Sequence, residues 1–247
     1  MYLELYMDRT LTFGGKTQEP GIRMLSDMSA VLLDSDILRD GDRGLYYMYR
    51  DLALSIKDRE IIQENSLRYD ITIIPPGMLG REYVKTEGHY HPIVPGTDIS
   101  YPEVYEVLSG EAHYLLQKLD AVGVSDVVLI KASAGDKIII PPDYGHVTIN
   151  AINKELKMAN WVSRDFSSVY EPYIEMHGAA YYLTDEGMIK NPTYRDVPEV
   201  REIIPRNFNQ VGLIKSKEMY GLIRSIKDLA FLNQPQEFMG LFEDFMA

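Results

Sequence analysis

The sequence predicts an all-β fold with a helical C-terminal extension. Many short runs rich in Val, Ile and Tyr are separated at close intervals by turns that contain Gly or Pro, such as Pro75-Pro76-Gly77. Closely spaced strands of this kind are typical of a sandwich or barrel, and we expect a jelly-roll barrel. After about Tyr194 the apolar residues instead follow helical spacing, which predicts helices at the C-terminal end.

The expected strands are the segments with β-branched or alternating apolar residues. They are 45–54, 67–74, 81–91, 103–108, 112–119, 127–132, 137–140, 147–152, 157–163, 179–183 and 188–190. Ser109-Gly110 predicts a hairpin between two of these strands, and the three prolines of 92–102 predict a loop. Residues 1–23 show an irregular pattern, and Ser26-Asp27 predicts a helical turn.

We expect residues 1–193 to form the barrel with an N-terminal extension, and residues 194–247 to form helices that pack on the barrel or on a dimer partner. Pro235 suits a first helical residue. The helical apolar positions are Met219, Leu222, Ile223, Ile226, Leu229 and Ala230, followed by a stripe of Phe238, Leu241, Phe242 and Phe245. Because this stripe needs a covering surface, we expect a homodimer, which a gel-filtration mass of one chain would contradict.

The composition limits the classes of function. With 25 Lys and Arg against 37 Asp and Glu, the net charge of −12 argues against nucleic acid or an anionic membrane as a partner. The chain has no Cys, so any metal ligands must be His or carboxylate. No signal peptide and no apolar run of about 18 residues are apparent, and we expect a soluble cytoplasmic protein.

Two histidines at i and i+2 suggest a metal site. If the stretch is a strand, His89 and His91 point to the same face. Glu103 precedes Gly110 with a six-residue gap, and His146 stands four residues before Asn150. Three imidazoles and a carboxylate would leave open positions on one divalent ion per subunit, with iron(II) expected first and manganese, nickel or zinc as alternatives.

These motifs together resemble the two cupin motifs. The fuller string resembles the cupin-type glucose-6-phosphate isomerases of archaea and some bacteria, over roughly residues 24–162. The matching pieces are Leu25-Ser26-Asp27-Met28, Thr86-x-Gly88-His89-x-His91, Glu103-Val104-Tyr105-x-x-Leu108-x-Gly110 and Pro141-Pro142-x-x-Gly145-His146-x-Thr148-x-Asn150. The resemblance implies a cupin jelly-roll barrel that interconverts glucose 6-phosphate and fructose 6-phosphate.

The resemblance also implies how the substrate phosphate is held. Threonine hydroxyls and a backbone N–H would bind it rather than an arginine cluster, and the matching positions are Thr72, Thr86 and Gly88. Without a Cβ, Gly88 can bring its N–H close to a phosphate oxygen. Since the whole chain is acidic, such a site must supply its own local positive potential.

Further sugar contacts are implied by the same resemblance. Tyr105 matches a tyrosine that points at the sugar, whereas Trp161 and Tyr170 align less well with an aromatic residue and a later tyrosine. A histidine that the family has between them is absent here, where Ser167 and Ser168 stand instead. The remaining histidines, His113 and His177, are expected to be structural or on the surface.

For catalysis, the implied metal would act as a Lewis acid while Glu103 moves a proton between C2 and C1. A carboxylate bound to the metal is a poorer base, so a hydride shift is the open alternative. Tyr105 would orient the substrate or relay a proton. Two rival functions are another cupin metalloenzyme, such as a different sugar-phosphate isomerase or epimerase or a dioxygenase, and a non-catalytic sugar-binding sensor. The phosphate-binding set Thr72, Thr86 and Gly88 distinguishes the isomerase, since an oxygenase has no use for it.

Overall fold

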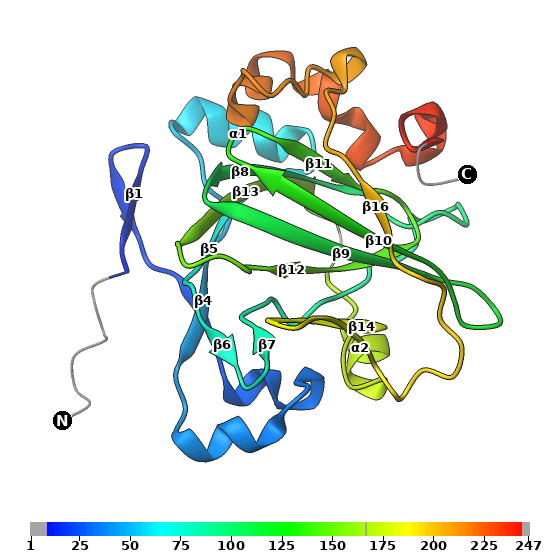
Figure 1. Ribbon diagram of the computed structural model, residues 1–247. Helices are drawn as coiled ribbons and strands as arrows, with labels where there is room; N and C mark the ends of the chain where they lie inside the picture. Colours follow the sequence, from blue (N-terminus) through cyan, green and yellow to red (C-terminus); the bar gives the residue numbers. More distant parts are fainter. Residues whose placement is uncertain (1–8, 166, 244–247) are drawn as a thin grey trace.

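The computed structural model describes residues 9–165 and 167–243, and their core is a barrel of two β-sheets (Figure 1). One sheet has six antiparallel strands in the order β11-β8-β13-β5-β4-β3, and the facing sheet has the order β12-β9-β10-β16. The first comprises β3 (Gly21–Met24), β4 (Gly44–Tyr49), β5 (Leu67–Ile74), β8 (Glu103–Ser109), β11 (Lys137–Ile140) and β13 (Leu156–Ser163). The second comprises β9 (Glu111–Leu119), β10 (Val124–Ser133), β12 (Tyr144–Ile149) and β16 (Arg201–Ile203). The predicted all-β class is therefore confirmed.

Smaller strands flank this barrel. A third sheet has the order β15-β14-β7-β6, and an antiparallel hairpin β1-β2 lies near the N-terminus. These strands are β1 (Leu11–Phe13), β2 (Lys16–Gln18), β6 (Met78–Leu79), β7 (Glu82–Tyr83), β14 (Tyr181–Thr184) and β15 (Gly187–Lys190). The irregular structure predicted for 1–23 is thus wrong for 9–23, because Gly14 and Gly15 adopt positive φ and close a hairpin turn.

Short helices lie outside the sheets, on two sides of the barrel (Figure 1). They are α1 (Ile56–Glu64), α2 (Glu171–Glu175) and the 3₁₀ helices η1 (Ser26–Val31), η2 (Ser35–Asp40), η3 (Asn209–Val211), η4 (Met219–Leu232), η5 (Pro235–Glu237) and η6 (Met239–Leu241). The helical turn expected near Ser26-Asp27 is confirmed by η1. Helix α1 was not predicted from the sequence, although its capping signal is present: Ser55 Oγ accepts a hydrogen bond from the Asp58 N–H. No helix among the described residues is long and apolar enough to span a membrane.

Three predictions about the strands are wrong. Strands β8 and β9 do not pair as a hairpin, because the chain turns a corner at Gly110 and passes from one sheet to the other. The segment 81–91 is extended but is regular only in β7, since Gly88 adopts φ +85° and interrupts it. The bridge between His89 and His146 still holds this segment against β12. Strand β4 ends at Tyr49, well before the predicted residue 54.

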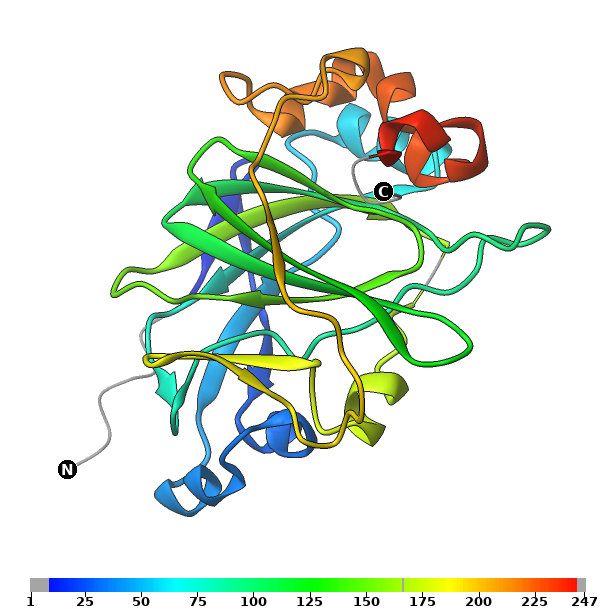
Figure 2. The same ribbon diagram turned by 45° about the vertical axis from the view of Figure 1, so that its right-hand side comes forward.

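The C-terminal segment, residues 208–242, packs on the outer face of the six-stranded sheet. Figures 1 and 2 show the orange and red helices beside α1 on one side of the barrel, and the segment with β16 leads to them across the barrel. Trp161, Leu229, Phe231, Leu241 and Phe242 are buried there in one cluster. The described part of the predicted apolar stripe is therefore covered by this chain itself, which removes that argument for a homodimer. Phe245 lies outside the described residues.

A buried ion pair also joins this segment to the barrel. Lys137 Nζ lies 2.8 Å from the Glu106 carboxylate, and both side chains are almost fully buried. The second Glu106 oxygen accepts a hydrogen bond of 2.7 Å from the Met219 N–H. Lys137 also donates to the Lys217 carbonyl. Because Glu106 lies on the same strand as Glu103 and Tyr105, the C-terminal segment supports the back of a strand whose front carries two predicted site residues.

Candidate active site

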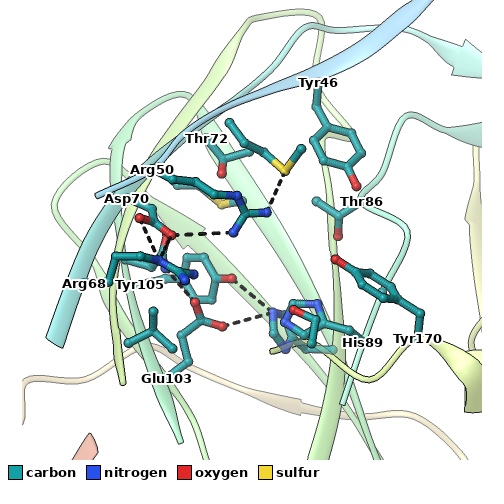
Figure 3. Close-up of a pocket in the computed structure, with 17 residues that line it drawn as sticks. Tyr46, Arg50, Arg68, Asp70, Thr72, Thr86, His89, Glu103, Tyr105 and Tyr170 are labelled. Carbon is teal, nitrogen blue, oxygen red and sulfur yellow. Dashed lines mark hydrogen bonds and ion pairs between the residues drawn. The ribbon is translucent and has the colours of Figure 1, made fainter. Parts of the chain in front are cut away.

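The inner face of the six-stranded sheet forms one wall of a polar pocket. Strand residues two apart share a face, and alternate positions of four neighbouring strands line the pocket. Tyr105 on β8 is paired with Asn160 on β13, which is paired with Asp70 on β5. In the next row, Met158 on β13 is paired with Thr72 on β5. Figure 3 shows Tyr105, Asp70 and Thr72 reaching into the same space from adjacent strands.

Four potential metal ligands converge at the end of this pocket. Nitrogen or oxygen atoms of His89, His91, Glu103 and His146 all lie within 4.8 Å of one another. The His91 Nε2 atom is 3.2 Å from His89 Nε2 and 3.3 Å from Glu103 Oε2, which lies 3.7 Å from His146 Nε2. Ligands bound at about 2.1 Å are roughly 3 to 4 Å apart around one ion, so this set fits a divalent cation. The predicted shared face of His89 and His91 is confirmed by the distance between their rings.

Neighbouring groups hold these ligands in the orientation that a metal requires. The His91 Nδ1 atom lies 2.7 Å from the Tyr101 carbonyl oxygen. Because a carbonyl oxygen only accepts hydrogen bonds, Nδ1 carries a hydrogen and donates it. The His91 Nε2 lone pair is therefore directed at the cluster. Asn160 Nδ2 donates to Glu103 Oε1 at 2.7 Å, so Oε2 is the carboxylate oxygen that faces the histidines. Asn160 was not predicted from the sequence.

The protonation states also suit a metal. Burial lowers the pKa of His146 to about 4, and burial with the nearby His146 and His91 holds the pKa of His89 well below its usual value. Both rings are therefore neutral at pH 7. Burial alone would raise the pKa of Glu103, but the hydrogen bond and charge of His91 hold it below its usual value, so the group is a carboxylate. At neutral pH His89 and His146 therefore offer neutral imidazole nitrogens and Glu103 offers an anionic oxygen, as divalent metal ions require.

Gly88 is required by the backbone at the mouth of this cluster. Its φ is +85°, and an added Cβ would lie 2.7 Å from Val147 Cγ2 and 3.1 Å from the Tyr173 ring. A larger residue would therefore move the strand-like segment that carries His89 and His91. This steric requirement explains the glycine without reference to a ligand, and it places the Gly88 backbone on the pocket wall.

The other predicted polar residues also line the pocket. Thr72 projects from β5, and Thr86 Oγ1 accepts a hydrogen bond of 2.9 Å from the Thr148 N–H, which leaves its hydroxyl hydrogen available to donate. The Tyr105 hydroxyl lies 3.1 Å from His146 Nε2. Burial and the charge of Glu103 raise the pKa of Tyr105 well above its usual value, so Tyr105 is a neutral hydrogen-bond donor.

The two aromatic residues that align less well have different positions. Tyr170 lines the pocket, with its ring centroid 5.7 Å from that of His89. Trp161 does not reach the pocket, and its predicted sugar contact is wrong. Because neighbours on a strand face opposite sides, Trp161 points away from the cavity that Asn160 lines. It is fully buried on the outer face, where its Nε1 donates to the Met219 carbonyl.

Of the remaining candidate residues, one serine lines the pocket and the others lie outside it. Ser168 lines the pocket, whereas Ser167 is exposed. His113 lies on β9 with its Nε2 3.7 Å from a Glu111 oxygen, and His177 adopts φ +56° just after α2. Neither histidine lines the pocket.

The pocket wall also carries a group of charged residues that was not predicted from the sequence. Arg50, Arg68 and Asp70 all line the pocket, together with Tyr46. Arg68 Nε donates to both Asp70 oxygens, at 2.8 and 3.1 Å. The alternation of Arg68, Asp70 and Thr72 along a confirmed strand is the signal that could have found them. Arg68 is paired with Asp70, whereas Arg50 lies 3.8 Å from Asp70 and makes no hydrogen bond with it, so Arg50 is the cation of this wall that is least neutralised by its neighbours.

A family model matches the part of the chain that forms this pocket. Residues 22–199 match the family model described as Glucose-6-phosphate isomerase (GPI). The chain belongs to this family. The matched range contains all the pocket residues but ends before the C-terminal helices.

Individual members of the glucose-6-phosphate isomerase family are moderately similar to the chain. The glucose-6-phosphate isomerase of Thermococcus litoralis is 27% identical over 181 residues, which cover 70% of this chain and 87% of that protein. That of Pyrococcus furiosus is 28% identical with the same coverage. The putative glucose-6-phosphate isomerase 1 of Rhizobium meliloti is 26% identical over 134 residues, which cover 52% of this chain and 58% of that protein.

Proposed function

We propose that this protein is a metal-dependent isomerase that interconverts glucose 6-phosphate and fructose 6-phosphate. The observation that carries the proposal is the placement of Glu103 and Tyr105. Both line one pocket together with Thr72 and Thr86, beside the cluster of three histidines and within the region that the family model matches. A dioxygenase or a plain metal sensor would have no need for this combination of a buried carboxylate, a neutral phenol and an anion-binding wall.

We further propose that His89, His91, Glu103 and His146 hold one divalent ion. A set of imidazoles with one carboxylate and no thiolate suits iron(II), manganese, nickel or zinc, and iron(II) is our first expectation. When bound, such an ion supplies Lewis acidity that stabilises negative charge on the C1 and C2 oxygens of the open-chain sugar. Its removal from the protein is therefore expected to abolish the isomerisation.

The residues of the chain would handle the sugar and its proton. The Glu103 carboxylate is positioned by Asn160 and would take the proton from C2 of the aldose and return it to C1. The neutral Tyr105 hydroxyl would donate a hydrogen bond to a sugar oxygen that becomes negative during this transfer. The hydroxyls of Thr72 and Thr86 and the Gly88 N–H would hold the phosphate. The burial of this pocket end limits the access of water to the transferred proton.

A coupled assay tests the proposed function. Purified protein would be supplied with fructose 6-phosphate, and glucose 6-phosphate would be detected, before chelation, after chelation and after iron(II) or manganese is restored. We expect chelation to remove at least about 99% of the activity and metal to restore it. Protein that binds one equivalent of metal but shows no activity with any of these metals would contradict the isomerase and favour a sensor or another cupin chemistry.

A further inference from the structure

Arg50 is a pocket residue that neither the metal cluster nor the threonines account for. It follows the last residue of β4, and Tyr46, Met48 and Arg50 stand at alternate positions that line the pocket. In Figure 3 its guanidinium group lies in the middle of the pocket, between Asp70 on one side and Tyr46 and Thr86 on the other. Its position is therefore suited to contact a ligand rather than only the wall.

The two arginines of the pocket are paired very differently. Arg68 Nε makes two close hydrogen bonds with the Asp70 carboxylate, which also accepts the Asp51 N–H at 2.8 Å. The nearest Arg50 nitrogen is 3.8 Å from Asp70, too far for a hydrogen bond. Its other described contact is with the Met48 thioether at 3.2 Å, which is a weak acceptor. Asp70 is thus committed mainly to Arg68, and within residues 9–165 and 167–243 most of the Arg50 donors have no strong acceptor.

The neighbours of Arg50 place it next to the expected phosphate position. Met48 is the β4 residue paired with Thr72 on β5, and Arg50 folds back onto the Met48 sulfur. The Arg50 backbone lies at the level of Asp70 on the neighbouring strand. The contact with Met48 therefore directs the guanidinium group toward Thr72. Its side chain is 49% exposed, so its donors remain accessible to a ligand that enters the pocket. A phosphoryl group between the Thr72 and Thr86 hydroxyls would lie on this side of the pocket.

We propose that Arg50 binds the anionic group of the substrate and sets the preference for phosphorylated over neutral sugars. This inference rests on the proposed function. It adds a charged residue to a phosphate site that was expected to consist of threonine hydroxyls and a backbone N–H. Arginine can make two parallel hydrogen bonds to a phosphate, which gives orientation as well as affinity. In a chain with a net charge of −12, this positive group also offsets the long-range repulsion of an anionic substrate.

The test compares Arg50→Gln with the control Arg39→Gln in metal-loaded protein. Arg39 is 81% exposed in η2, and it pairs with Asp36 outside the pocket. Calorimetry would measure the affinity for inorganic phosphate, and the isomerase assay would measure KM and kcat. We expect Arg50→Gln to weaken phosphate binding and raise KM by roughly 10- to 100-fold, with kcat changed by less than about threefold. Arg50→Lys should recover part of the loss, and the control should change neither value.

The outcomes separate this inference from the proposed function. Loss of phosphate affinity in Arg50→Gln, in protein without isomerase activity, would support the role of Arg50 and contradict the isomerase. Isomerase activity in which Arg50→Gln leaves both KM and phosphate affinity unchanged would overturn the role of Arg50 alone. Because Arg50 is half exposed and makes one weak hydrogen bond, the variant is expected to fold, which its melting temperature would verify.

Discussion

Replacing Glu103 by glutamine is expected to lower kcat by about 10²- to 10⁴-fold, the range that removal of a general base produces. The substitution preserves the size of the side chain and an oxygen that can still accept the Asn160 hydrogen bond of 2.7 Å. It removes the negative charge that faces His91 and His146. The loss would therefore come from chemistry rather than from misfolding, and the melting temperature of the metal-loaded variant should stay close to that of the native protein.

Two measurements separate the roles of Glu103 as a ligand and as a base. Metal content after dialysis reports the ligand role, and transfer of solvent deuterium into the product reports the base. If Glu103 moves the proton, native protein incorporates solvent deuterium at the reacting carbon, whereas a hydride shift would incorporate none. Glu111→Gln is the matched control, because Glu111 lies on β9 outside the pocket. A Glu103→Gln protein that keeps its metal and more than about a tenth of its activity would contradict a proton shuttle.

The cluster of potential metal ligands was predictable because local spacing determines most of it. His89 and His91 share a face in any extended segment, and the motifs around Glu103 and His146 give the other two ligands. The segment remains extended over its bridge to His146 even though Gly88 interrupts the expected strand. Periodicity carries no information about which strands pair. The expectation that Glu103 and His146 lie close to the two other histidines therefore came from the resemblance to a family.

The rest of the site depends on pairing and register, which a single sequence does not reveal. Asn160 reaches Glu103 because β13 lies between β8 and β5, and Arg50 reaches the pocket because β4 pairs with β5. The Gly110 turn looked like a hairpin because a glycine with positive φ serves equally well at a corner between two sheets. The face on which Trp161 lies was also not predictable, since a shift of one position along a strand exchanges the two faces of the sheet.

Trp161→Ala is expected to lower the free energy of unfolding by about 3–5 kcal/mol while leaving KM within about twofold of the native value. The indole is fully buried between the sheet and the C-terminal segment, with its ring centroid 4.8 Å from Tyr69 and 5.9 Å from Tyr220. Removing it leaves a large cavity and a Met219 carbonyl without its donor. The pocket, on the other face of β13, keeps all of its own side chains.

Denaturation in urea, followed by circular dichroism, would measure this loss. Fluorescence is unsuitable for the variant because Trp161 is the only tryptophan of the chain. Trp161→Phe keeps an aromatic ring against Tyr69 and should lose less stability, since its residual cavity is smaller. A tenfold rise in KM with unchanged stability would instead place the indole in contact with the sugar. The expected result, low stability with native KM, would mean that the C-terminal segment contributes to catalysis only by keeping the sheet behind Glu103 and Tyr105 folded.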